Sequence, residues 1–576
     1  MAELRVRPLI TRTAVTADAG HDGDNLPQVE PILRRLYAAR GVTGSEQLDY
    51  ALRRLLPVSS LGGIDAAVDL ILRHRENRII VIGDFDADGA TSTALVLRCL
   101  REFGINDVAY LVPNRFEYGY GLSPEIVRVA ATQSPNLLIT VDNGVSSLEG
   151  VAEAHRLGIQ VLITDHHLPG KELPQADAMV NPNLDDNEFA SSHLAGVGVA
   201  FYLMAALGRV LEAGGTSGAA RVPARYLDLV ALGTVADVVT LDHNNRILVQ
   251  QGLQRIRAGR AVPGIVALFQ QANRSPARAV STDLGFVVGP RLNAAGRLED
   301  MSIGIECLLT DDVSAAAKLA AMLDEINRER RSIEAKMRTE AFAYVDAMEA
   351  RNFPPCVCLY DSQWHQGIVG LIAARVRERC DRPVIAFARE EEGMLKGSAR
   401  SIGGVHIRDL LEAISSAKPG MIEKFGGHAM AAGLSLPEQH FDEFSKVAAQ
   451  QLGRLYPDAD FSGAIPTDGE LPAAAMNLEF AKVLREAGPW GAGFPEPVFT
   501  GNFRVDEQRT VGENHLKLRV TPAGGGASVD AIAFNQAGQV CRGVVQLTYK
   551  LDVNEYRGFE SPQLIVEQIV NIGEPA

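Results

Sequence analysis

Three aspartates stand at alternate positions in the segment IIVIGDFDADGATS, residues 79–92. The segment opens with apolar, mostly β-branched residues, which are typical of a buried parallel strand, and it closes with small residues typical of a helix start. Because Asp84, Asp86 and Asp88 repel one another in so short a turn, the pattern predicts a bound divalent cation. An EF-hand calcium loop is disfavoured, since a strand precedes the turn and its glutamate position is apolar. A solvated acidic turn is the remaining alternative.

Further side chains of the metal-ligating types follow two other predicted strands. Asp142 follows one apolar run in ITVDNG, and Asp165, His166 and His167 follow another in VLITDHH. Taken singly, Asp142 could cap a helix and a histidine could be structural. Short apolar runs separated by helical segments predict a parallel α/β sheet, whose carboxyl edge would gather all these groups. The predicted strands are Arg78–Ile82, Val108–Val112, Leu137–Val141 and Gln160–Thr164.

Composition limits the classes of protein that the chain can belong to. Its 576 residues exceed one ordinary core and predict two to four domains. We expect a cytoplasmic protein with no membrane segment, since no apolar run approaches the roughly 18 residues needed and the N-terminus lacks a signal peptide. The six scattered cysteines fit reduced, buried thiols. A net charge of −15 argues against a nucleic-acid partner, but it is an average that local arginine clusters can overcome.

The sequence pattern divides the chain into five parts. We expect an N-terminal helical arm over 1–60 and an α/β domain carrying the acidic motifs over 61–309. Apolar residues at helical spacing predict one long connecting helix over 310–352. A second, smaller α/β domain is expected over 353–455, and a C-terminal β-barrel over 456–576.

Two glycine-rich segments outside the acidic motifs suggest contacts with a ligand. GPRLNAAGRLEDMS carries Arg291 and Arg297, which could instead form structural salt bridges. In FGGHAMAAG, the glycines before a histidine suggest backbone that approaches a phosphate at a helix N-terminus, although Gly-Gly also suits any turn.

The last part of the chain predicts a single-strand-binding barrel. Five strand-like runs fit an OB-fold, a barrel type that binds single strands by stacking bases on aromatic side chains in a charged groove. Tyr549, Tyr556, Arg557 and Phe559 are the candidates for this contact. The alternative for the aromatic residues is that they fill the barrel.

The motifs resemble those of a known superfamily. DFDADG, TVDNG, TDHH and GTVADVV, in this order and spacing, are similar to the four motifs of the DHH phosphoesterases. The resemblance implies two manganese or magnesium ions bridged by Asp142. It assigns Asp86 to one ion, and Asp88, His166 and Asp237 to the other. Asp84 is taken as a further metal ligand, and His167 as a contact to the scissile phosphate, so that the predicted catalytic residues are His167, Asp142 and Asp84.

The chemistry of these residue types agrees with that assignment. Oxygen-rich sites with one or two imidazoles suit Mn²⁺ and Mg²⁺ better than zinc. Two such ions can activate a water and stabilise the leaving oxygen in an in-line displacement, so that hydrolysis needs no protein nucleophile.

The match narrows to one branch of the superfamily. PNRFEYGYGLS and GPRLNAAGRLEDMS resemble the RecJ branch, which are single-strand-specific 5′ exonucleases of DNA repair and recombination, and GGH followed by AAG resembles their DHHA1 domain. The resemblance implies single-stranded DNA as substrate, with a single-strand DNA-binding protein and a RecQ-type helicase as partners. The residues that it nominates for DNA contact are Arg291, Arg297, Ser398, Arg400, Gly427, His428, Tyr556, Arg557 and Phe559.

Two other functions stay open at this point. The first is a DHH phosphodiesterase acting on pyrophosphate, cyclic dinucleotides or short oligonucleotides, although such proteins are usually shorter and lack the barrel. The second is a DNA-binding replication factor that has lost its chemistry. The sequence disfavours the latter, because every predicted ligand position carries a competent residue.

Overall fold

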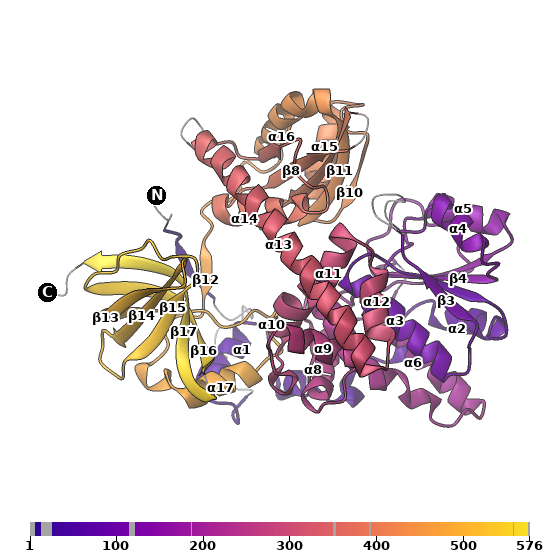
Figure 1. Ribbon diagram of the computed structural model, residues 1–576, viewed down its shortest axis with the longest axis horizontal. Helices are drawn as coiled ribbons and strands as arrows, with labels where there is room; N and C mark the ends of the chain where they lie inside the picture. Colours follow the sequence, from indigo (N-terminus) through magenta and orange to yellow (C-terminus); the bar gives the residue numbers. More distant parts are fainter. Residues whose placement is uncertain are drawn as a thin grey trace. The chain divides into compact units, whose positions relative to one another are not determined.

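The computed structural model in Figure 1 describes most of the chain. The described residues are 6–12, 26–113, 121–185, 187–349, 353–390, 393–556 and 558–573. The chain divides into two compact units. The first contains Met1–Leu292, Met301–Ala320 and Ala464–Ala576, and the second contains Asn293–Asp300 and Ala321–Gly463.

A parallel sheet forms the centre of the first unit, and its strand order is β3-β2-β4-β5-β6. The four predicted strands are confirmed, with ends within one residue of those expected. A fifth strand was missed because three residues are too few to give a sequence pattern. The strands are β2 (Ile79–Ile82), β3 (Val108–Leu111), β4 (Leu137–Val141), β5 (Gln160–Thr164) and β6 (Ala178–Val180).

Helices cover both faces of this sheet (Figure 1). On one face, Ile80 and Ile82 of β2 pack with Ile126 of α4 and Val151 of α5, all of them buried. The opposite face is covered by α3 and α6. Burial on both faces explains why the strands are continuous apolar runs rather than alternating ones. These helices are α2 (Ile64–Arg73), α3 (Ala87–Glu102), α4 (Pro124–Ala131), α5 (Leu148–Arg156) and α6 (Gly196–Ala213).

By length and composition, α6 could cross a membrane. However, 67% of this stretch is buried inside the protein, where it packs on α3, α7 (Leu227–Ala236) and the sheet. Its apolar character is therefore accounted for by the core of the first unit.

Short helices that come before and after the sheet in the sequence complete the first unit. They precede the sheet as α1 (Pro31–Ala38) and three 3₁₀ turns, Ser45–Leu48, Leu52–Arg54 and Val58–Ser60. A π-helix, Leu284–Val288, follows the short α10. The helices after the sheet are α7 (Leu227–Ala236), α8 (His243–Arg257), α9 (Pro263–Gln271), α10 (Ser281–Asp283), α11 (Gly289–Leu298) and α12 (Ser302–Leu309).

The second unit is the smaller α/β body, and the predicted long helix leads into it. That helix is α13 (Val313–Glu349), 37 residues long. The sheet has the order β10-β11-β9-β8-β7, and only β7 and β8 are parallel. Its elements are β7 (Val357–Tyr360), α14 (Val369–Cys380), β8 (Val384–Arg389), β9 (Met394–Arg400), α15 (Ile407–Ala417), β10 (Lys424–Gly427), β11 (Ala431–Pro437) and α16 (Phe441–Leu455).

The C-terminal part is a closed barrel with the order β13-β14-β15-β17-β16, as predicted. Tyr549 is fully buried inside it against Phe503, so the expectation that Tyr549 stacks on a base is wrong, because its ring fills the core. The strands and the flanking helix are α17 (Leu478–Glu486), β13 (Phe499–Val511), β14 (His515–Pro522), β15 (Val529–Ala533), β16 (Val544–Tyr556) and β17 (Phe559–Gly573).

One buried carboxylate ties the N-terminal segment to the start of the barrel. Asp468 follows β12 (Ile465–Thr467), which pairs in parallel with β1 (Leu9–Thr11). Its Oδ1 accepts a bond from Arg40 Nη1 at 2.9 Å, and its Oδ2 accepts bonds from Arg12 Nη1 at 2.7 Å and Val498 N at 2.9 Å. The side chains of Arg40 and Asp468 are each 1% exposed, so water could not replace either partner if the other were removed.

We therefore expect Asp468→Ala to destabilise the first unit strongly. Removing one partner of a buried pair costs about 3–5 kcal/mol, because the other charge stays buried and unpaired. Urea denaturation followed by circular dichroism would measure the loss. The matched control is Asp506→Ala, a more exposed carboxylate paired with Arg504 at the barrel surface, which should cost about 1 kcal/mol or less. Equal effects of the two substitutions would contradict this account.

Candidate metal centre

The turn after β2 supplies the first carboxylates. Asp84 is buried, and Asp86 is the N-cap residue of α3, where its Oδ1 accepts the backbone N–H groups of Asp88 at 2.9 Å and Gly89 at 3.0 Å. Capping was the alternative explanation for an aspartate after a strand, and Asp86 does cap. The same carboxylate also has an oxygen that lies within reach of Asp84 and Asp142, as described below.

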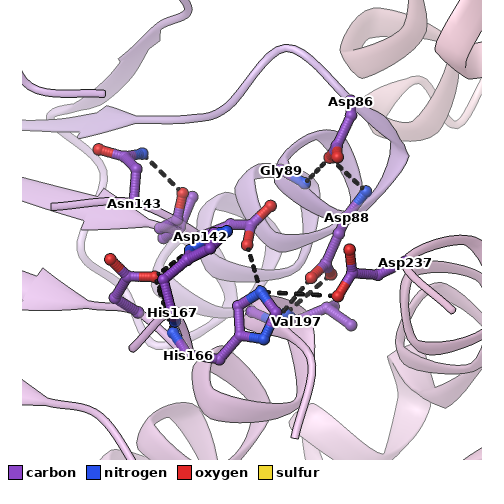
Figure 2. A network of polar contacts seen from close by, with 12 residues as sticks. Asp86, Asp88, Gly89, Asp142, Asn143, His166, His167, Val197 and Asp237 are labelled. Atoms are coloured by element: carbon purple, nitrogen blue, oxygen red, sulfur yellow. Dashed lines mark hydrogen bonds and ion pairs between the residues drawn. The ribbon is translucent and has the colours of Figure 1, made fainter. Parts of the chain in front are cut away.

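Asp88, in the first turn of α3, is held by the start of another helix. Its Oδ2 accepts the N–H of Gly196 at 2.6 Å and its Oδ1 accepts that of Val197 at 3.0 Å, both in the first turn of α6 (Figure 2). Helix N-termini favour negative charge, so α6 fixes this carboxylate in place. The approach is so close that a Cβ on Gly196 would lie 2.6 Å from Asp142 Cβ, which excludes any larger residue at that position.

Asp142 follows β4 in a strained conformation. Its φ of 62° lies in the left-handed region, which non-glycine residues rarely adopt. The next residue, Asn143, is fully buried, and its Nδ2 donates to the carbonyls of Val141 at 2.9 Å and Ile82 at 3.1 Å. Asn143 therefore ties the end of β4 to the end of β2 and holds the strained turn.

The two histidines that follow β5 have different neighbours. His166 Nε2 lies 3.1 Å from Asp142 Oδ1 and 3.5 Å from Asp237 Oδ2 (Figure 2). His167 Nδ1 is 2.7 Å from Oδ1 of the buried Asp165, which also accepts the backbone N–H of both histidines. One ring therefore joins the acidic cluster, and the other is oriented by its own carboxylate.

Asp237 completes the cluster from the end of α7. It is the C-cap residue of that helix, where the helix dipole is unfavourable to a carboxylate. A bound cation would offset both this dipole and the neighbouring charges.

These side chains form three overlapping groups, in each of which one ligand atom per residue lies within 4.8 Å of the others. One group is Asp84, Asp86 and Asp142, and another is Asp88, His166 and Asp237. The third joins Asp142 with both histidines. The sequence-predicted ligands therefore converge on two adjacent sets of oxygen and nitrogen atoms, and Asp142 lies between them.

The negative charges of the clustered carboxylates repel one another. Burial and the Asp86 charge raise the pKa of Asp88 to about 7. Burial and the surrounding aspartates, Asp88 first among them, raise the pKa of Asp142 well above its usual range, and the pKa of Asp237 shifts the same way for the same reasons. A set of five carboxylates and one imidazole is the donor chemistry of Mn²⁺ and Mg²⁺, and a divalent ion would remove the repulsion. The residues therefore fit such a metal.

His167 and Asp165 behave as an ion pair. Burial lowers the pKa of His167, but the hydrogen bond to Asp165 and the Asp165 charge outweigh it and raise the pKa to about 9. Burial raises the pKa of Asp165, and the His167 hydrogen bond and charge reverse that effect and lower it to about 2. Asp165, in the motif TDHH, was expected at the acidic edge of the sheet but was given no role as a partner of His167, and Asn143, in the motif TVDNG, was not singled out.

The predicted DNA contacts in the second unit lie on β9 and in a hairpin. Ser398 and Arg400 alternate on β9, and Arg400 Nη1 donates to Ser398 Oγ at 3.1 Å. A Cβ on Gly370, in the first turn of α14, would lie 2.9 Å from both side chains. Gly427 ends β10 and His428 lies in the turn to β11, so the expectation that the Gly-Gly-His segment starts a helix is wrong. The two glycines instead pair with Gly433 and Ala432 of the adjacent strand.

The remaining candidates differ in exposure. Arg291 is buried and donates to the carbonyl of Val287 at 2.6 Å, and Arg297 donates to that of Gly367 at 3.1 Å, contacts that a structural arginine would make. Tyr556 and Phe559 face each other at the tip of the β16–β17 hairpin and are 66% and 81% exposed. Arg557 lies outside the described residues. Their contact with DNA stays a prediction.

Comparison with known proteins identifies the class of this fold and site. Residues 78–234 match the DHH family, N-terminal domain, residues 353–454 match the DHHA1 domain, and residues 467–568 match the RecJ OB domain. The parallel sheet with its acidic edge is thus the catalytic domain of a DHH-type phosphoesterase.

Relatives over the full length narrow the class to one family. Single-stranded-DNA-specific exonuclease RecJ of Dickeya dadantii is 54% identical over 95% of this chain and 96% of its own length. The Escherichia coli protein of the same name is 51% identical over 94% and 96%. The crystal structure of Thermus thermophilus RecJ with Mn²⁺ superposes with a TM-score of 0.80 at 28% identity, covering 100% of this chain and 80% of that one. The chain belongs to the RecJ family.

The metal-free cluster should destabilise the protein in a pH-dependent way. The pKa values of Asp88, Asp142 and Asp237 are raised on folding. These groups therefore add to the free energy of unfolding at low pH, where they are protonated, and this contribution is lost as pH rises through neutrality. Asp142→Asn should therefore raise the free energy of unfolding of the metal-free protein by about 1–3 kcal/mol above pH 7. It should also abolish the stabilisation that Mn²⁺ gives to the wild type.

Differential scanning fluorimetry with EDTA and with Mn²⁺, over a pH series, would measure both effects. Asp107→Asn, which removes an exposed carboxylate paired with Arg78, is the matched control and should change neither. An Asp142→Asn variant that still gains stability from Mn²⁺ as the wild type does would contradict the assignment.

Proposed function

We propose that this chain is a metal-dependent exonuclease that degrades single-stranded DNA from its 5′ end. The observation that carries the proposal is the convergence of three strand ends and the end of α7 on two adjacent ligand sets, which are linked where His166 Nε2 lies 3.1 Å from Asp142 Oδ1. Its relatives are named for single-strand-specific exonuclease activity, and the Thermus protein was crystallised with Mn²⁺ and with Mg²⁺. We propose Mn²⁺ or Mg²⁺ for this site, acting in DNA repair and recombination.

In this proposal Asp142 would contribute to holding both of two ions. Asp84 and Asp86 would hold one ion, and Asp88, His166 and Asp237 the other. When bound, such a pair of ions lowers the pKa of a water and neutralises charge on the phosphodiester. The chain keeps the ligands in place through Asn143, through the α6 N-terminus on Asp88, and through the cap that Asp86 makes on α3.

His167 would act on the phosphate rather than on a metal. Its Nδ1 is engaged by Asp165, and this fixes the ring so that Nε2 is the atom that would contact a phosphate oxygen. Asp165 is in turn held by the backbone N–H of Val145 at 2.8 Å. Asp165 is thus a positioning residue for His167, in the way that a carboxylate orients a catalytic imidazole.

The 5′ end would be recognised in the second unit. Arg400 is a largely buried cation, and burial and the Arg377 charge lower its pKa. Among the residues that the structure describes, none supplies a carboxylate in an ion pair with Arg400. Together with Ser398 and the first turn of α14, it offers a site for a phosphate, since helix N-termini favour anions. Gly427 and His428 of the hairpin are proposed to contact the same strand.

The remaining assignments follow the family. We propose that Arg291, Arg297, Tyr556, Arg557 and Phe559 contact the DNA, with the exposed rings at the hairpin tip stacking on bases. A cytoplasmic location, and a single-strand DNA-binding protein and a RecQ-type helicase as partners, are proposed on the same ground. The proposed domains are the arm 1–60, the DHH domain 61–309, the connecting helix 310–352, the DHHA1 domain 353–455 and the OB domain 456–576.

The activity is tested by a time course on a long, 5′-phosphorylated single strand with Mn²⁺. We expect mononucleotides released from the 5′ end and no degradation of blunt duplex. Arg400→Ala should raise KM for phosphorylated ends at least tenfold and leave unphosphorylated ends unaffected, because charge-assisted hydrogen bonds contribute about 1.5–3 kcal/mol. The matched control is Arg389→Ala on β8, an exposed arginine paired with Glu438.

Two results would contradict this proposal. Turnover of short oligonucleotides or cyclic dinucleotides without turnover of the long strand would favour a DHH phosphodiesterase instead. Loss of the preference for phosphorylated ends in Arg389→Ala but not in Arg400→Ala would move the 5′ site elsewhere.

The role of Asp165 gives a separate prediction. Asp165→Asn keeps an oxygen that can accept the backbone bonds but removes the charge that orients His167, so kcat should fall about 100-fold while Mn²⁺ affinity is retained. Isothermal titration calorimetry would measure the Mn²⁺ affinity, and single-turnover hydrolysis would measure the rate of the chemical step separately. The kcat loss should match that of His167→Ala, and the double variant should be no worse than either. An unchanged kcat in Asp165→Asn would refute the positioning role.

A further inference from the structure

The π-helix Leu284–Val288 presents an aromatic side chain to solvent. Leu284 and Val288 are fully buried, whereas Phe286 between them is 77% exposed. π-Helices are rare in proteins and occur frequently at functional sites. The buried neighbours anchor the backbone of Phe286 in the core, so a contact made by its ring would need little further ordering of the backbone.

This π-helix is packed on the turn that carries a proposed metal ligand. A Cβ on Gly285 would lie 3.2 Å from Val235 Cγ1, and one on Gly289 would lie 3.2 Å from Ala236 Cβ. Both contacts are made with the last turn of α7, immediately before Asp237. The glycines on either side of Phe286 therefore place its backbone beside the helical turn that ends at Asp237.

A second apolar residue is exposed on that turn. Val238 directly follows Asp237, has a φ of 64° and is 70% exposed. A left-handed conformation is unusual for any non-glycine residue and is a strained outlier for a β-branched one. Strained residues at functional sites are held by the surrounding structure, here by the Asp237 N–H bond to Gly233 at 2.9 Å and the Val238 N–H bond to Val235.

We propose that Phe286 is a base-stacking residue for the strand being hydrolysed, with Val238 extending its apolar surface. This inference rests on the proposed function, which places a phosphodiester at the metal centre. An exposed ring on a segment that packs against the last turn of α7 suits the face of a nucleobase, because stacking on an aromatic side chain accepts every base. It would position the strand without reading its sequence, as a nuclease that degrades any single strand requires.

The proposal is tested with oligonucleotides that carry one abasic nucleotide at successive positions from the 5′ end. In wild type, removal of the stacked base should lower kcat/KM about tenfold at one position near the 5′ end. In Phe286→Ala, kcat/KM on the intact strand should fall by a similar factor, and the abasic nucleotide should cause no further loss at that position. Phe286→Tyr, which keeps the ring, should behave as wild type.

Two controls separate stacking from damage to the fold. Hydrolysis of a strand made entirely of abasic nucleotides, a diester substrate without any aromatic ring, should be unchanged in Phe286→Ala. Val210→Ala, which trims an exposed apolar residue on α6, should leave all the kinetics unchanged. Degradation of the intact strand by wild type reports on the proposed function itself, so failure there is distinct from failure of this inference.

The inference is overturned if the abasic penalty in Phe286→Ala equals that of wild type at every position, since Phe286 and the base would then act independently. It is also overturned if Phe286→Ala lowers hydrolysis of the fully abasic strand and of the intact strand by the same factor. That result would show that Phe286 supports the metal centre rather than the strand.

Discussion

Repulsion among buried carboxylates is the constraint around which the first unit is arranged. Asp88, Asp142 and Asp237 all have raised pKa values because burial and one another's charges oppose ionisation. A fold can keep such a cluster only if backbone groups hold it and a cation completes it. The α6 N-terminus on Asp88, the Asn143 bonds between two strand ends, and the strained φ of Asp142 are the devices that hold it.

The same constraint reconciles an acidic chain with a nucleic-acid substrate. A net charge of −15 would repel DNA if it were spread evenly over the surface. Part of that negative charge instead lies in the cluster of aspartates, where divalent ions would neutralise it. The charge of Asp468 is neutralised by its ion pairs with Arg12 and Arg40. Arg400 shows the converse, a cation kept largely buried with no acidic partner among the described residues.

The strands and the ligand positions could be predicted from sequence because both depend on local pattern. Apolar runs buried on both faces marked β2, β4 and β5, and the acidic residues directly after them had to meet at one edge. The Gly-Gly-His segment was misassigned because two glycines suit a hairpin as well as a helix start, and only the pairing with β11 decides. Tyr549 and Tyr556 lie on one strand, but the barrel buries the first and exposes the second. Such differences depend on tertiary contacts that spacing does not encode.

Residues that position other residues were the hardest to find from sequence. Asp165 and Asn143 carry no signal beyond their place in a motif, since a buried carboxylate or amide acts through partners far away in the chain. The end of α7 shows the same dependence: a carboxylate at the unfavourable end of a helix is followed by a strained valine, and the turn before it packs against a π-helix. Each feature alone is unfavourable, and the three together are accounted for if a cation binds Asp237 and a strand passes over it. Function thus explains local conformations that folding stability by itself would select against.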